Sequence, residues 1–112
     1  MTTLEQLQMF LRSPSTLDGE LNAFGVRPPI TCKDGYELSV QASSRHYCTP
    51  RKDRAKFYIE VEVGFPSYHD DLLGEDNDCG VYACVPVENV AVLINKHGGM
   101  NLENNNHQET LR

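Results

Sequence analysis

Apolar and polar residues alternate over residues 57–65, the most regular pattern in this chain of 112 residues. The apolar positions are Phe57, Ile59, Val61, Val63 and Phe65. A period of two is typical of a strand with one buried face. We therefore predict a long strand over this range. The residues expected on its solvent side are Tyr58, Glu60, Glu62 and Gly64.

Three shorter strands are predicted around it. Residues 30–32 and 36–43 flank Lys33-Asp34-Gly35, and Asp-Gly is a strong hairpin signal because both residues tolerate a positive φ. In 36–43, alternation predicts a buried side made of Tyr36, Leu38, Val40 and Ala42. The polar side of the same predicted strand is expected to carry Glu37, Ser39 and Gln41. A last strand is predicted over 81–85, with one side formed by Val81, Ala83 and Val85.

Two helices are predicted near the N-terminus. Over residues 3–12, helical spacing is kept by Leu4, Leu7, Phe10 and Leu11. Thr2 with Glu5, and equally Thr3 with Gln6, fits the capping-box pattern that begins a helix. A second, shorter helix is predicted over residues 15–24.

A further helix is predicted near the C-terminus. Pro86 fits the first turn of a helix, where its missing N–H costs nothing. Helical spacing then continues to His97, and Gly98-Gly99 stops the helix.

These elements predict an α+β fold: a four-stranded antiparallel sheet with the N-terminal and C-terminal helices packed on one face. Residues 1–100 are expected to form a single domain, as the chain length suggests. Residues 101–112 are polar and include three consecutive Asn, so we expect a disordered tail there.

Composition and termini indicate a cytoplasmic protein without membrane contact. The chain is 39% hydrophobic and 23% charged, which is ordinary for a globular protein. No apolar run approaches the roughly 20 residues that span a bilayer, and the first residues lack the features of a signal peptide. We expect no cofactor.

The net charge of −6 is unevenly distributed. We call residues 45–56 the basic segment, because one acid, Asp53, accompanies five cations there: Arg45, Arg51, Lys52, Arg54 and Lys56. We call residues 70–78 the acidic segment, which has five acids and no base: Asp70, Asp71, Glu75, Asp76 and Asp78. Such charge runs are either solvated loops or contacts for partners.

The candidate chemistry centres on His46 and Cys48. With Cys79 and Cys84 they offer four zinc ligands, but the Cys-x₄-Cys and His-x-Cys spacings depart from zinc knuckles, so no metal is predicted. Alternatively, the neighbouring cations would lower the pKa of an exposed Cys48 thiol and make it a nucleophile. The four cysteines, which include Cys32, are expected to be reduced thiols in the cytosol.

Three segments carry a resemblance to known proteins. They are residues 39–51 (SVQASSRHYCTPR), residues 61–67 (VEVGFPS), and Val85-Pro86-Val87-Glu88 opening a helix that ends at His97-Gly98-Gly99. Together they resemble small accessory proteins of tailed phages and prophages of Proteobacteria, over about residues 36–99. The resemblance implies a small accessory phage protein acting in the host cytoplasm. Such proteins are often inhibitors that bind host machinery, anti-CRISPR and other anti-defence proteins among them.

The leading hypothesis is a non-catalytic protein that binds and inhibits or modulates a host protein complex. Because the chain is acidic, we expect its partner to present a basic surface. The predicted contact residues are Glu60, Glu62, Asp70, Asp71, Glu75, Asp76 and Asp78. The basic loop offers a second set, made of Arg45, His46, Tyr47, Arg51, Lys52 and Arg54. An exposed sheet edge would also allow a homodimer.

Two alternatives stay open. The first is a small enzyme or zinc-binding protein that uses His46 and Cys48. The second is a nucleic-acid-binding module that uses the basic segment, in which the rings of His46 and Tyr47 stack on bases and the cations meet phosphates. The negative net charge argues against direct nucleic-acid binding, since such proteins are usually basic.

Overall fold

The computed structural model describes residues 1–12, 26–75 and 80–102. Its elements are α1 (Thr3–Arg12), β1 (Ile30–Thr31), β2 (Glu37–Gln41), β3 (Glu60–Gly64), the 3₁₀ helix η1 (Asp71–Leu73), β4 (Val81–Pro86) and α2 (Val87–Lys96). The strands pair antiparallel in the order β1-β2-β3-β4, which confirms the predicted α+β fold. The helix predicted over 15–24 and residues 103–112 of the predicted tail lie outside the described residues.

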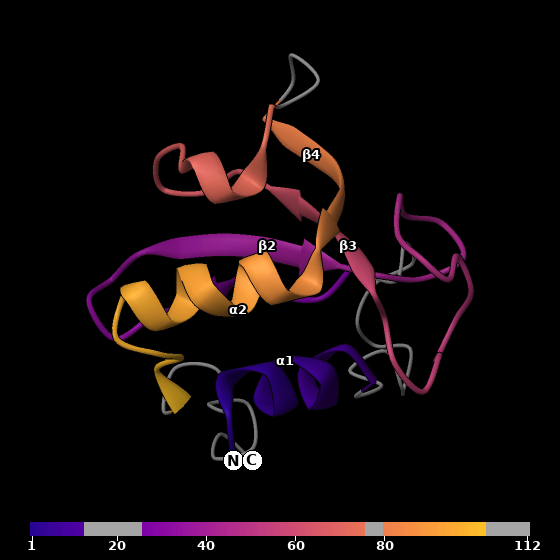
Figure 1. Cartoon of the computed structure of the whole chain (residues 1–112), viewed down its shortest axis with the longest axis horizontal. Helices are drawn as coiled ribbons and strands as arrows, with labels where there is room; N and C mark the ends of the chain where they lie inside the picture. Colours follow the sequence, from indigo (N-terminus) through magenta and orange to yellow (C-terminus); the bar gives the residue numbers. More distant parts are fainter. Residues whose placement is uncertain (13–25, 76–79, 103–112) are drawn as a thin grey trace.

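The two α-helices cover the sheet together. Helix α2 lies across the sheet, and α1 packs alongside α2 (Figure 1). Their apolar faces meet the inward side chains of β2, β3 and β4 in one core. The fully buried residues of this core include Leu7, Leu11, Leu38, Val40, Val61, Val63, Val90 and Ile94. No helix of the described part is long and apolar enough to cross a membrane.

The predicted hairpin joins β1 to β2. Ile30 pairs with Leu38. Asp34 Oδ1 accepts a 2.9 Å hydrogen bond from the Tyr36 N–H, and Gly35 takes a φ of 99° that favours glycine. The Asp-Gly pair therefore acts in the turn as its residue types predict.

Both helices begin near the predicted positions. The Thr2 N–H donates to the Glu5 carboxylate at 2.8 Å, and the Glu5 N–H donates to the Thr2 hydroxyl at 3.1 Å, which completes the predicted capping box. Pro86, predicted in the first turn of the helix, is instead the last residue of β4, with an extended ψ of 131°, and α2 begins at the next residue. His97 then caps α2, and Gly98 leaves the helix with a φ of 92°.

The strand predicted over 57–65 is shorter than its alternation suggests. Tyr58, expected in solvent, is fully buried, whereas Phe57, Ile59 and Phe65 are 44%, 55% and 70% exposed. The side-chain amide of Gln8 explains the inversion, because it accepts from the Tyr58 N–H at 3.0 Å and donates to the Tyr58 carbonyl at 2.9 Å. Helix α1 thus holds Tyr58 inward, and its two neighbours in sequence turn out to solvent.

Strand β4 contains a bulge that the sequence does not reveal. Val61 pairs with Val85 and Val63 pairs with Tyr82. Three residue steps along β4 therefore lie opposite two residue steps along β3, which is a β-bulge. Within the bulge, Cys84 has a φ of 51°. As a result Tyr82 is buried and Ala83 is exposed, and the predicted alternation is wrong at Ala83.

Gln41, expected on the solvent side of its strand, is buried. Its side-chain amide accepts from the Arg27 N–H and donates to the Arg27 carbonyl, both at 2.9 Å. The Arg27 guanidinium is buried as well and donates to the carbonyls of Ala42 and Leu11. The segment before β1 therefore covers this end of β2 and replaces solvent there.

Candidate functional site

The cations of the basic segment are free of ion pairs. All five are exposed, and none takes part in the salt bridges found among the described residues. Asp53, the acid of the segment, is engaged locally, since its Oδ1 accepts from the Ser44 N–H at 2.9 Å and from the Ser44 hydroxyl at 3.1 Å. Both hydrogen bonds lower the pKa of Asp53, and the one from the Ser44 N–H has the larger effect. The positive charge of the segment is therefore available to a partner.

Large apolar side chains are exposed beside these cations. Tyr47, Phe57 and Ile59 are 51%, 44% and 55% exposed. The guanidinium of Arg51 lies over the Tyr47 ring, 5.0 Å from its centroid. We call residues 45–59 the 45–59 loop, which extends beyond one end of the sheet (Figure 1). Its exposed cations and apolar residues are Arg45, Tyr47, Arg51, Lys52, Arg54, Lys56, Phe57 and Ile59.

The backbone of this loop is anchored to the sheet. The Thr49 N–H donates to the Glu60 carbonyl at 3.0 Å, and the Ile59 N–H donates to the Thr49 carbonyl at 2.8 Å. The Tyr47 carbonyl accepts from the Cys84 N–H at 3.1 Å, within the bulge of β4. The irregular strand thus supplies a donor that fixes the loop in place.

Glu60 and Glu62, predicted as contact residues, hold the same loop. The Glu60 carboxylate accepts from the Thr49 hydroxyl at 2.8 Å, and the Glu62 carboxylate accepts from the Tyr47 N–H at 2.9 Å. Both glutamates are half-buried. One oxygen of each carboxylate, Oε1, is therefore used within the molecule.

His46 and Cys48 belong to the loop, but their side chains are buried. His46 Nδ1 lies 2.7 Å from the Ser43 hydroxyl, and burial lowers the pKa of His46. The Cys48 thiol donates to the carbonyls of Ser43 at 3.2 Å and Pro50 at 3.4 Å. Burial raises the pKa of Cys48, opposite to the shift that activates a nucleophile.

A metal site at these residues also lacks support. No group of three or more His, Cys, Asp or Glu side chains within the described ranges is arranged to hold a metal ion. Cys79, one of the predicted zinc ligands, lies outside those ranges. Cys84 is exposed and Cys32 is buried.

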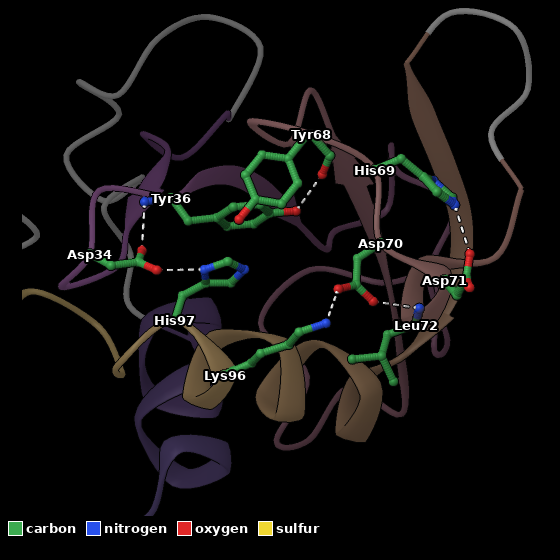
Figure 2. Close-up of polar contacts among 9 residues, drawn as sticks. All are labelled: Asp34, Tyr36, Tyr68, His69, Asp70, Asp71, Leu72, Lys96 and His97. Carbon is green, nitrogen blue, oxygen red and sulfur yellow. Dashed lines mark hydrogen bonds and ion pairs between the residues drawn. The ribbon is translucent and has the colours of Figure 1, made fainter.

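The described carboxylates of the acidic segment differ in burial, and Figure 2 shows the contacts of Asp70 and Asp71. Asp70 Oδ1 accepts from the Leu72 N–H at 2.9 Å and caps η1, while Oδ2 lies 2.6 Å from Lys96 Nζ. Only 9% of the Asp70 side chain is exposed. The Asp71 side chain is fully exposed and lies 3.3 Å from His69 Nε2. Glu75 is exposed, and Asp76 and Asp78 lie outside the described residues.

Sequence reasoning missed a stacked ring pair at the C-terminal end of α2, where His97 follows Lys96. The His97 ring lies parallel to the Tyr36 ring at a centroid distance of 3.9 Å, and its Nδ1 is 2.7 Å from Asp34 Oδ2 (Figure 2). The Tyr36 hydroxyl donates to the Tyr68 carbonyl at 2.7 Å, and burial raises the pKa of Tyr36 to about 12. Because Asp34 and His97 are far apart in sequence, no local pattern links them.

The contacts of this ring pair connect the β1–β2 turn to the C-terminal end of α2. The Asp34 N–H donates to the His97 carbonyl at 3.2 Å, so backbone and side chains tie the hairpin turn to the end of α2. His97 Nε2 is buried and has no hydrogen-bond partner in the structure. His97 is only 6% exposed, so its ring is closed off from solvent.

Comparisons with protein-family models, with curated proteins and with solved structures found no match to this chain. The function is therefore argued from the geometry of the two charged segments.

Proposed function

We propose that this protein acts by binding, without catalysis, and that it contacts a negatively charged macromolecule through the 45–59 loop. The observation that carries the proposal is the combination of exposed cations, which form no ion pair with the described residues, and exposed aromatic residues on an anchored backbone. Arg and aromatic residues are enriched in protein interfaces, where they supply most of the binding energy. The phage setting and the anti-CRISPR role remain predictions from the sequence resemblance.

The loop offers a better contact than the predicted contact residues Asp70, Glu60 and Glu62 do. Lys96 and the backbone of η1 already occupy Asp70, and Thr49 and Tyr47 occupy Glu60 and Glu62. A partner that used these carboxylates would first have to displace the internal bonds. The cations of the loop need no such displacement.

Retention on a heparin column tests the proposal, because heparin is a polyanion that requires no knowledge of the natural partner. The double variant Arg45→Gln and Lys52→Gln removes two charges from the loop. The matched control, Arg12→Gln and Lys33→Gln, removes one Arg and one Lys that are exposed elsewhere.

The proposal predicts that the loop variant elutes at a clearly lower salt concentration than the wild type, while the control elutes close to the wild type. Equal shifts for both variants would indicate a response to net charge alone. That result, or no retention of the wild type, would refute the loop as a contact surface.

A further inference from the structure

We propose that the negatively charged partner of the 45–59 loop is single-stranded nucleic acid. This inference rests on the proposed function and names the partner class for the same surface. Proteins that bind single strands combine a cationic path for phosphates with aromatic rings on which bases stack. The loop carries both within one anchored stretch of chain.

The described part of the chain is close to neutral, although the whole chain is acidic. The described residues hold nine Lys or Arg and ten Asp or Glu, a net charge of −1. Five of the six excess negative charges of the chain therefore lie in the other residues. Next to the loop, Glu60 and Glu62 each have one carboxylate oxygen bonded within the molecule, to Thr49 and Tyr47 respectively.

The rings of the loop suit unpaired bases. The Arg51 guanidinium lies over the Tyr47 ring, and Tyr47 keeps about half of its surface exposed. Phe57 is exposed by a specific cause, the inward fixation of Tyr58 by Gln8. Tyr, Phe and guanidinium planes all stack on bases. The fold thus leaves the rings of Tyr47 and Phe57 exposed in the same loop as the cations.

Double-stranded nucleic acid fits the loop less well. Major-groove readers usually insert a helix or a two-stranded ribbon. Residues 45–59 contain neither, apart from the Thr49 bridge to Glu60. Stacking on Tyr47 and Phe57 also requires bases that have left their own stack.

Fluorescence anisotropy with a labelled oligodeoxythymidine, an oligouridine and a duplex of equal length tests this inference on the full chain. If five cations meet phosphates, the affinity for the single strands should fall about 100-fold between roughly 50 mM and 200 mM salt. The single strands should bind more tightly than the duplex. No binding of either single strand at low salt, or tighter binding of the duplex, would overturn the inference.

Ring variants separate stacking from charge. The double variant Tyr47→Leu and Phe57→Leu keeps every charge and should weaken single-strand binding by about fivefold or more. The control Phe65→Leu removes an exposed ring at the other end of β3 and should leave the affinity within about twofold. Circular dichroism would verify that each variant is folded. Equal losses in both variants would contradict stacking in the loop.

The heparin and oligonucleotide experiments together distinguish a failure of this inference from a failure of the proposed function. Loop-dependent retention on heparin without oligonucleotide binding would overturn this inference and keep the proposed function, with an acidic protein surface as the partner. Retention that does not depend on the loop would overturn both.

Discussion

The basic segment and the acidic segment resemble each other in the sequence, since each is a short polar stretch with five charges of one sign. The fold treats them differently. It uses Asp70 to cap η1 and to pair with Lys96, while it leaves the cations of the basic segment exposed and unpaired in the described part of the chain. A run of charge therefore says little about availability until the internal partners are known.

The largest expected effect on stability concerns the hydrogen bonds that Tyr58 makes inside the 45–59 loop. The Tyr58 hydroxyl donates to the Lys52 carbonyl at 2.6 Å and accepts from the Ala55 N–H at 3.1 Å. Tyr58→Phe leaves both groups without this partner, so the free energy of unfolding should fall by about 1–3 kcal/mol. Urea unfolding measures the change. An unchanged midpoint would contradict the view that Tyr58 anchors the loop.

The next effect separates two neighbouring aspartates of the acidic segment. Asp70→Asn weakens the bond to Lys96 and the cap of η1, so the free energy of unfolding should fall by about 1 kcal/mol. Asp71→Asn removes an exposed carboxylate and should change it by less than about 0.5 kcal/mol. Thermal or urea unfolding of both variants provides the comparison, and equal losses would contradict the different roles assigned to them.

A smaller effect concerns acid stability at the hairpin turn. The N–H of Tyr36, and then His97, lowers the pKa of Asp34. A carboxyl with a lowered pKa in the folded state contributes stability at neutral pH that is lost as the pH falls below about 4. The unfolding free energy of Asp34→Asn should therefore depend less on pH below about 4 than that of the wild type. Parallel pH curves for the two proteins would contradict this role of Asp34.

The smallest effect is expected from the basic segment itself. Arg45→Gln with Lys52→Gln should leave the free energy of unfolding within about 0.5 kcal/mol of the wild type, because both side chains are exposed and unpaired. The same variant should lose retention on heparin. A clear loss of stability would show that these cations have a structural role and would weaken the comparison with Asp70.

Local sequence signals predicted much of the fold. The capping box of Thr2 and Glu5, the Asp34-Gly35 turn and the Gly98 stop of α2 each depend on residues within a few positions, and each is present. Such features follow from short-range chemistry.

The errors came from contacts between distant segments. Gln8 fixes Tyr58 inward, Arg27 covers Gln41, and the bulge in β4 exposes Ala83. Each contact joins residues that alternation alone cannot relate. The candidate site inherits this limit, because Phe57 was expected in the core and is instead exposed beside the cations.

The most direct test of the central claim is a backbone amide NMR titration of the full chain with a short heparin oligosaccharide. We predict that the largest chemical-shift changes fall within residues 45–59, with little change at Asp71 to Leu73 in η1. Changes centred on η1 or α2, or spread evenly over the chain, would contradict the assignment of the 45–59 loop as the contact surface.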